Sequence, residues 1–548
     1  MTRGVPNTMP KNRSNLGPLA VAMALSLLLG FGLARALQAT DDLRSNLDLF
    51  QNVLYLVQNN YVDAPDNQKL IKGAIDGMLK TLDPHTQFLP EKRAQQMDEQ
   101  FHGEYSGIGV QFDIVDNKIV VISPIEGTPA YRLGIRAGDK IFEIDGQPLK
   151  KGLNTDDVFK ALRGPNGSTV AVTIERDDEP EPLHFTIERA KIPIESIPYA
   201  FMIKPGVGYV RMIRFAQTTG DELEAAITKL QAQGMKSLLI DLRSNSGGLL
   251  SQAVDVLDQL VPDNQRLVYT RGRIPSANAD YYSTNRPGKW TTGPLVVLVD
   301  HGSASASEIV SGAVQDLDRG IVAGINTFGK GLVQNQMNMS EGKLLLTIAR
   351  YYTPSGRGIQ RPYGDKNDQA EYVEEAFKED VPTDSALATR PRFKTSSGRV
   401  VYGGGGIYPD VVIKDPPNLT RPEVEFITKR AGFEFATHYW LRQRAAEKFT
   451  PASFDTRFQL TDADWQKMRE VLEARKVTMN DSTFAAEKDF MTHQIRAELA
   501  SAQFGSLERY KIAIEDDAQL NAALDLFPRA QKLMAGAAQN PPKKGRSR

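Results

Sequence analysis

The stretch DHGSASASEIV at residues 300–310 places three serine hydroxyls between a strand pattern and a helix pattern. The apolar run PLVVLVD leads into it, and apolar residues follow at helical spacing from Ile309 onwards. A hydroxyl at this junction lies near backbone N–H groups and the positive end of the helix dipole, which stabilise an oxyanion on a substrate carbonyl. The stretch therefore fits a nucleophile. The local pattern alone favours a helix cap, because Ser305 and Glu308 have the spacing of a capping box.

A serine nucleophile needs a base, and two side chains are candidates. His301 lies four residues before Ser305, at the end of the strand pattern. Lys330 lies in TFGKGLVQ between two glycines, where an apolar neighbourhood would lower the pKa of its amine through desolvation. The neutral amine could then accept the serine proton. Each residue also has an alternative without catalysis. His301 could support the site from behind or lie at the surface, and Lys330 could be an exposed lysine in a turn.

Other hydrolase and nucleotide-binding chemistries lack their sequence patterns. The six histidines show no pair at metal-ligand spacing and the chain has no cysteine, so a zinc hydrolase is disfavoured. No G-x-S-x-G elbow is present, and the GGGG at residues 403–406 lacks the lysine of a P-loop. We therefore expect no metal ion and no cofactor.

The bulk composition describes a soluble globular protein of several domains. A chain of 548 residues exceeds the size of one ordinary core. Hydrophobic residues make up 41% and charged residues 24%, which excludes wholesale disorder and a polytopic membrane protein. The formal net charge of −1 gives no basic excess for nucleic-acid binding.

The first 39 residues predict export. Basic residues at positions 3, 11 and 13 precede an apolar run of nineteen residues from Leu16 to Ala34, and the small residues of ALQA follow as a cleavage site. The run is marginally long enough to span a membrane, so cleaved signal and retained anchor both stay open. Either way, the remaining chain would lie outside the cytoplasm, in the periplasm, free or anchored to the inner membrane.

Two regions of different character follow. Residues 41–100 show apolar residues at spacings of three and four and are predicted to be helical. Residues 101–190 hold short β-branched runs separated by turn residues and predict a compact β-rich module. The order GIGV, then SPIEGTPAYRLGIRAGDKIFEIDG, then a short helix resembles PDZ domains. This resemblance implies capture of a peptide C-terminus by Gly107, Ile108, Gly109 and Val110. Arg163 is either a sensor of that peptide or a contact to the core.

The remaining chain divides into an α/β layer and a helical region. Residues 191–415 alternate continuous apolar strands with helices, which predicts parallel strand pairs, with a loop-rich segment at 361–400. Residues 416–535 show several helical patterns, and residues 536–548 are predicted to form a basic disordered tail. The predicted fold is therefore multidomain α/β with an inserted β-rich module.

Several motifs together resemble the carboxyl-terminal processing proteases, also called tail-specific proteases. They are LLIDLRSNSGGLL, SASASEI, TFGKGLVQ, DPHTQFLP, YYTPSGRGIQ and the PDZ-like module, within residues 41–415. The resemblance implies a crotonase- and Clp-protease-like core and a serine endopeptidase. In it Ser305 is the nucleophile, Lys330 the general base and Gln334 the residue that orients the lysine. It also implies an oxyanion hole made by the backbone N–H of Ala306 and of Gly247 or Gly248.

Three functions remain as alternatives. The main prediction is an endopeptidase that binds protein substrates by their C-terminal tails and processes or degrades exported proteins. The second is a non-catalytic PDZ-containing scaffold, which the joint presence of Ser305, Lys330 and Gln334 disfavours. The third is an acyl-CoA enzyme of the crotonase type. The C-terminal helical region leaves adaptor binding, homo-oligomerisation and gating open, and membrane association would depend on the N-terminal apolar segment.

Overall fold

The computed structural model describes residues 42–539 apart from 178, 285–287, 364–368, 379–383, 415–416 and 445–448. The predicted signal at residues 1–39 lies outside the described residues. The chain forms two compact units, which divide between Leu79 and Lys80. The first unit contains the predicted helices, at residues 42–60 and in α2 (Asn67–Lys80). Within the described part of the chain, no helix combines the length and apolarity that a membrane crossing requires.

A six-stranded sheet forms the centre of the second unit, with the strand order β10-β11-β12-β15-β16-β21. From β11 to β21 all neighbouring strands are parallel, whereas β10 pairs antiparallel with β11. Both faces of this sheet are covered by helices. Strands buried on both faces are apolar along their whole length, as the continuous apolar runs in the sequence predicted. The strands are β10 (Tyr199–Lys204), β11 (Val207–Arg211), β12 (Ser237–Asp241), β15 (Leu295–Val299), β16 (Ile321–Gly324) and β21 (Val411–Val412).

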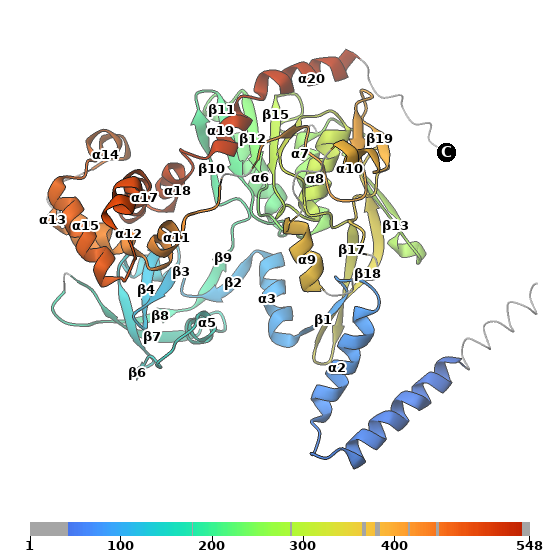
Figure 1. Ribbon diagram of the computed structural model, residues 1–548, viewed down its shortest axis with the longest axis horizontal. Helices are drawn as coiled ribbons and strands as arrows, with labels where there is room; N and C mark the ends of the chain where they lie inside the picture. Colours follow the sequence, from blue (N-terminus) through green and yellow to red (C-terminus); the bar gives the residue numbers. More distant parts are fainter. Residues whose placement is uncertain are drawn as a thin grey trace, which may run out of the picture. The chain divides into compact units, whose positions relative to one another are not determined.

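Helices from two distant parts of the chain cover the two faces (Figure 1). Along β12, Leu238 and Ile240 pack in the core beneath α6, α7 and α8, while Leu239 packs in the core formed with α19 and α20. Residues of α19 and α20 therefore belong to the core around the central sheet, although the sequence placed the end of the α/β layer at residue 415. These helices are α6 (Thr219–Ala232), α7 (Leu250–Leu260), α8 (Ala306–Asp316), α19 (Ala518–Leu524) and α20 (Phe527–Gln539).

A second, antiparallel sheet lies beside the central one and has the order β1-β18-β13-β14, with β17 also paired to β18. Its first strand comes from the start of the second unit, and Gln87 in β1 pairs with Leu345 in β18. The connection to the next module contains α3. The elements are β1 (Gln87–Pro90), α3 (Glu91–His102), β13 (Arg266–Gly272), η1 (Pro275–Ala277), β14 (Ala279–Tyr282), β17 (Leu332–Met339) and β18 (Gly342–Tyr352).

The predicted β-rich module forms a sheet with the order β3-β4-β5-β7-β8, and β6 pairs with β5. Strand β3 is an edge strand of this sheet among the described residues. The short pair β2 and β9 joins the module to the rest of the chain. The elements are β2 (Glu104–Gly107), β3 (Val110–Val115), β4 (Lys118–Pro124), α4 (Pro129–Arg132), β5 (Lys140–Ile144), β6 (Gln147–Pro148), α5 (Thr155–Leu162), β7 (Thr169–Glu175), β8 (Leu183–Glu188) and β9 (Ala190–Pro193).

The segment at 361–400, expected to be rich in loops, contains two helices and a strand. The period of the apolar residues in EYVEEAF is helical, and Tyr372 and Ala376, four residues apart, are both buried. The prediction underestimated the regular structure because the helices are short and separated by polar residues. The elements are α9 (Gln369–Lys378), α10 (Asp384–Ala388), β19 (Arg392–Lys394) and β20 (Val400–Tyr402).

The C-terminal region is helical, as its patterns indicate. Most of it packs around its own apolar core, which includes Trp440, Phe454 and Met491. Helix α20 reaches Gln539, so its Ala-rich end continues four residues into the segment predicted as a tail. Residues 540–548 lie outside the described residues. The elements before α19 are α11 (Arg421–Thr428), α12 (Ala431–Glu434), the π-helical turn η2 (Phe435–Trp440), α13 (Leu441–Gln443), α14 (Pro451–Arg457), α15 (Asp462–Ala474), α16 (Asp481–Ala486), α17 (Lys488–Phe504) and α18 (Ser506–Ala513).

Candidate active site

The three serines of the SASAS stretch have different environments. Ser303 is buried and its hydroxyl donates to the Leu242 carbonyl at 2.8 Å. Ser307 is buried and its hydroxyl donates to the Asn245 carbonyl at 2.8 Å. Ser305 instead lines a pocket of about 440 Å³. Two of the hydroxyls therefore tie the loop to the end of β12, and Ser305 is the one that faces open space.

Ser305 immediately precedes α8 and has a left-handed backbone, with φ 53° and ψ −111°. This conformation is sterically strained and costs free energy in a residue other than glycine. Such strain is common in turns that orient a functional side chain. The predicted capping box is present, and Ser305 N–H donates to Glu308 Oε2 at 2.8 Å. The cap and the pocket-facing hydroxyl thus belong to the same turn.

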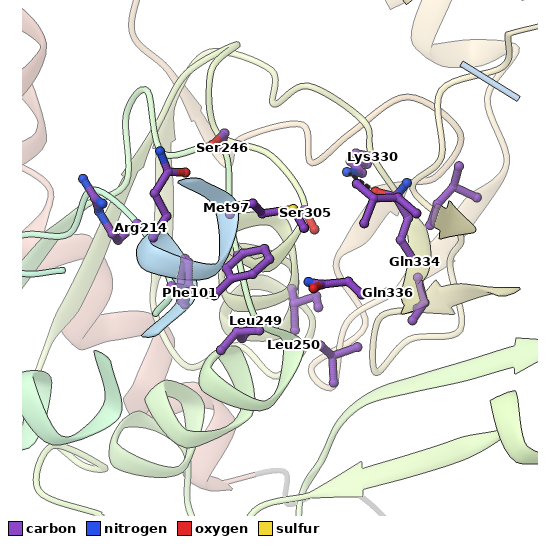
Figure 2. A pocket seen from close by; sticks show the side chains of 18 of the residues that line it. Met97, Phe101, Arg214, Ser246, Leu249, Leu250, Ser305, Lys330, Gln334 and Gln336 are labelled. Carbon is purple, nitrogen blue, oxygen red and sulfur yellow. Dashed lines mark hydrogen bonds between the residues drawn. The ribbon is translucent and has the colours of Figure 1, made fainter. Parts of the chain in front are cut away.

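Lys330 and Gln334 line the same pocket, as Figure 2 shows. Lys330 Nζ donates to Gln334 Oε1 at 2.9 Å, and Gln334 Nε2 donates to the His85 carbonyl at 2.6 Å. Burial lowers the pKa of Lys330, although the nearby charges of Glu308 and Asp83 act in the opposite direction. The amide of Gln334 is oriented by the carbonyl behind it, so its oxygen faces the lysine.

The buried carboxylate of Glu308 accepts hydrogen bonds from both segments of the site, the turn at Ser305 and the loop at Lys330. Its Oε2 accepts from the backbone N–H of Ser305 and of Lys330, each at 2.8 Å. Its Oε1 accepts from Gly329 N–H at 2.7 Å and from the Thr327 hydroxyl at 2.6 Å. Burial raises the pKa of Glu308, and these hydrogen bonds counteract that rise. The sequence indicated only a capping role, because the partners at 327–330 are distant in the chain.

Tyr351 provides a second connection between the same two residues. Its hydroxyl lies within hydrogen-bond distance of the carbonyls of Ser305 and Lys330. Tyr351 is 1% exposed and burial raises the pKa of its hydroxyl well above 10, so it stays neutral. The backbone separation of Ser305 and Lys330 is thereby fixed from two sides.

The glycines after β12 differ in what their N–H groups do. Gly247 N–H donates to Asn245 Oδ1 at 2.9 Å and is occupied. Gly248 N–H and Ala306 N–H have no acceptor among the described residues. A Cβ on Gly248 would lie 2.2 Å from the Phe215 carbonyl oxygen, and its φ of 148° suits only glycine. Of the two glycines left open by the sequence, Gly248 has the unoccupied donor.

Apolar side chains form part of the pocket wall near Ser305. They include Met97 and Phe101 of α3, Leu249 and Leu250 before and within α7, and Ile309 of α8. Figure 2 shows Met97, Phe101 and Leu249 on the side of Ser305 opposite Lys330. Such a surface suits an apolar side chain next to the bond that is attacked.

His301, the other candidate base, does not line this pocket. Its ring lies 6.5 Å from that of Phe377 in α9, and its Nδ1 is buried without a hydrogen-bond partner among the described residues. Within those residues, no cluster of three or more His, Cys, Asp or Glu side chains is placed to hold a metal ion. The structure thus brings Lys330, and not His301, to the pocket of Ser305.

The predicted peptide-binding loop precedes the edge strand β3. Gly109 has φ 82°, and a Cβ there would lie 2.3 Å from the Thr128 side chain, so only glycine fits. Phe112 of β3 faces α5, and its ring lies 5.8 Å from that of Phe159. An extended peptide added to this edge would lie against aromatic side chains.

Arg163 has partners outside the β-rich module. It pairs with Glu99 of α3 at 2.6 Å and stacks on the rings of Tyr105 and Phe159. Its side chain also lies beside Gly107, at 3.6 Å from a Cβ placed there. The partner outside the module is thus in α3 and not in the predicted core at residues 191–415, and a role of Arg163 in peptide binding stays a prediction.

Three family models match the chain. The model of peptidase family S41 matches residues 206–368, the PDZ domain model residues 120–176, and the model of the N-terminal domain of the activating protease CtpB residues 32–93. All the residues of the Ser305 loop, Lys330 and Gln334 lie within the first match.

Two curated relatives agree with these matches. A carboxy-terminal-processing protease of Bartonella bacilliformis is 40% identical over 316 residues, which are 57% of this chain and 72% of the relative. The carboxy-terminal processing protease CtpB of Bacillus subtilis is 33% identical over 331 residues, 59% of this chain and 68% of the relative. The solved photosystem II D1 C-terminal processing protease is 30% identical, with coverage of 66% and 85% and a TM-score of 0.34.

Proposed function

Because the chain belongs to peptidase family S41, as one of its carboxy-terminal processing serine proteases, we propose that Ser305, Lys330 and Gln334 hydrolyse the peptide bond. The predicted multidomain α/β fold with a PDZ domain and the predicted serine endopeptidase are both confirmed by this membership. The alternatives of a non-catalytic scaffold and an acyl-CoA enzyme receive no support. The observation that carries the site assignment is Glu308 Oε2, which holds the backbone N–H of Ser305 and of Lys330 at 2.8 Å each.

The proposed reaction proceeds in two halves. Neutral Lys330 accepts the proton of the Ser305 hydroxyl as the oxygen attacks the substrate carbonyl. The N–H groups of Gly248 and Ala306 stabilise the oxyanion, and the lysine returns the proton to the leaving amine. Water then attacks the acyl-enzyme and gives its proton to Lys330. The lysine passes that proton to Ser305 Oγ as this oxygen leaves, which releases the new carboxyl terminus and restores the serine hydroxyl and the neutral amine. Gln334 keeps the amine directed towards the serine throughout.

We further propose that the PDZ domain captures the substrate by its C-terminus. The unpaired edge of β3, the glycine-constrained loop at Gly109 and the aromatic pair Phe112 and Phe159 support this mode. A tail held there raises the local concentration of the adjoining chain at Ser305. We also place the enzyme outside the cytoplasm, on the basis of the basic residues and apolar run before residue 40.

The experiment that tests the site uses an unfolded protein with an apolar C-terminus as the substrate. The wild type is expected to cleave it and Ser305→Ala is expected to be inactive. Ser251→Ala, an exposed serine of α7, is the matched control and should cleave like the wild type. Cleavage by Ser305→Ala at the wild-type rate would refute the assignment.

A second assay addresses the PDZ domain. A peptide with a free apolar C-terminus should inhibit cleavage by competition, and the same peptide with an amidated C-terminus should inhibit much less. Equal inhibition by the two peptides would argue against carboxylate capture.

The location has its own test. In a bacterial host, the full chain should fractionate with the periplasm or the inner membrane. Replacing leucines of the apolar run by aspartates should retain the protein in the cytoplasm. The mass of the recovered chain then distinguishes a cleaved signal from an anchor, and an unchanged cytoplasmic location for both forms would contradict export.

A further inference from the structure

Helix α9 packs directly behind the lysine side of the candidate active site. It begins at Gln369, just beyond the residues matched by the peptidase family model, which end at 368. Its buried residues Tyr372 and Ala376 form one apolar cluster with Ala304 and Phe328. These partners flank Ser305 and Lys330 in the chain, so α9 touches both loops that carry the proposed dyad.

Tyr372 is the central residue of this contact and is 1% exposed. Its ring meets the His85 ring edge-on at 5.2 Å and the Phe328 ring at 5.7 Å. His85 is the residue whose carbonyl orients Gln334. The three rings therefore pack together next to the segment that carries Lys330.

The Tyr372 hydroxyl is connected to both glycines that flank Lys330. It lies 3.5 Å from the Gly329 carbonyl and accepts from Gln360 Nε2 at 2.9 Å. Gln360 Oε1 in turn accepts from Gly331 N–H at 2.8 Å. A single side chain of α9 is thus linked directly to the backbone before the lysine and, through Gln360, to the backbone after it.

The groups that face Lys330 are mostly uncharged. Burial and the charge of Lys330 lower the pKa of His85 to about 4, so its imidazole is neutral. Burial raises the pKa of Tyr372 to about 12, and that of Tyr351 also rises. Glu308 and Asp83 are the acidic groups that act on the lysine. Exclusion of water must outweigh those two carboxyl groups if the amine is to be neutral.

We propose that Tyr372 is a positioning residue for Lys330, because it excludes water from the lysine's far side and holds the Gly329–Gly331 backbone. This inference rests on the proposed role of Lys330 as the general base. Helix α9, which lies outside the region matched by the peptidase family model, would thereby have a specific task in the reaction. Tyr372 does not touch the substrate and acts only through the lysine.

The test is the pH dependence of kcat/KM on the unfolded substrate, measured for variants at position 372. Tyr372→Ala would admit water, so the pKa of Lys330 would rise and the acid limb of the profile would move up by roughly one pH unit. Tyr372→Phe keeps the ring but loses the hydroxyl contacts, so its acid limb should stay close to that of the wild type while kcat falls a few-fold. Phe377→Ala, an aromatic residue of the same helix that is 55% exposed, is the matched control and should leave the limb unchanged.

Two further measurements separate the possible failures. Thermal unfolding and binding of a C-terminal peptide to the PDZ domain identify a variant that has lost its fold; if Tyr372→Ala has, Tyr372→Leu replaces it. A folded variant without the ring whose acid limb coincides with that of the wild type overturns the inference. Activity in Lys330→Ala would instead overturn the proposed function, because the base itself would then be dispensable.

Discussion

Arg243, at the carboxyl end of β12, is held by both carboxylate oxygens of Asp517, at 3.1 and 2.6 Å. The same guanidinium binds Asp241, which is 1% exposed. Burial disfavours the charge of Asp241, but the hydrogen bonds and charge of Arg243 keep its pKa below the usual value. Arg243 begins the loop that contains Asn245, Gly247 and Gly248, so a C-terminal residue braces the proposed oxyanion loop.

We therefore expect Asp517→Asn to lower kcat more than it raises KM. The loss should be about tenfold, less than the 10²–10³ that removal of an oxyanion donor costs. The measurement is steady-state cleavage of the unfolded substrate. Asp516→Asn is the control, because that side chain is 85% exposed and should be neutral. An unchanged kcat in Asp517→Asn would show that Arg243 is adequately held by Asp241.

Glu308→Gln should remove most of the activity from a folded protein. An amide has one oxygen to offer where the carboxylate accepts four hydrogen bonds, and its NH₂ would face donors. We expect kcat to fall by more than about tenfold and the unfolding free energy to fall by about 1–3 kcal/mol. Chemical denaturation measures the second quantity. Wild-type kcat in this variant would contradict the role of Glu308 in fixing the dyad.

Activity should rise with pH through the ionisation of Lys330. Burial lowers the pKa of this lysine from 10.5, and only the neutral amine accepts a proton, so the enzyme is inactive below that pKa and active above it. The acid limb of kcat/KM should therefore fit a single group with a pKa below 10.5. Lys330→Arg should be inactive at all accessible pH values, because a guanidinium stays protonated. A rate that is independent of pH across the same range would exclude a lysine base.

Gly248→Ala should abolish cleavage and destabilise the protein. The added methyl would meet the Phe215 carbonyl oxygen at 2.2 Å, and a φ of 148° is unfavourable for alanine. Gly77→Ala is the control, since a Cβ there has no neighbour within 4 Å and the residue lies within helix α2. The control should be neutral or slightly stabilising in a thermal melt. Normal cleavage by Gly248→Ala would rule out its N–H as an oxyanion donor.

The sequence predicted the local geometry of the site better than its distant supports. Ser305 before a helix, Lys330 between glycines and the β-rich module all follow from neighbouring residues. The sequence does not reveal that Gln334 is oriented by the His85 carbonyl or that Glu308 binds Lys330 N–H, because both contacts join segments with no shared pattern. It also left Gly247 and Gly248 equivalent, since only the hydrogen bond to Asn245 distinguishes them.

Coverage of the central sheet shows the same limit. In the sequence these strands are continuous apolar runs, which correctly indicated that the sheet is buried on both faces. Nothing in those runs says which helices cover the second face, and α19 and α20 are separated from β12 by more than half of the unit's chain. Short amphipathic helices such as α9 are equally hard to assign, because a few buried residues are a weak periodic signal.

The pairing of β1 with β18 also implies an order in which the proposed site can be completed during synthesis. Gln87 cannot pair until Leu345 has been synthesised. The His85 carbonyl likewise cannot accept its hydrogen bond until Gln334, 249 residues later, has been synthesised. Contacts between such distant residues form late in folding, because a long intervening chain has to be ordered first. A growing chain that has just produced Ser305 therefore has a hydroxyl but no oriented base. We therefore expect proteolysis to begin only after β18 has been synthesised and paired.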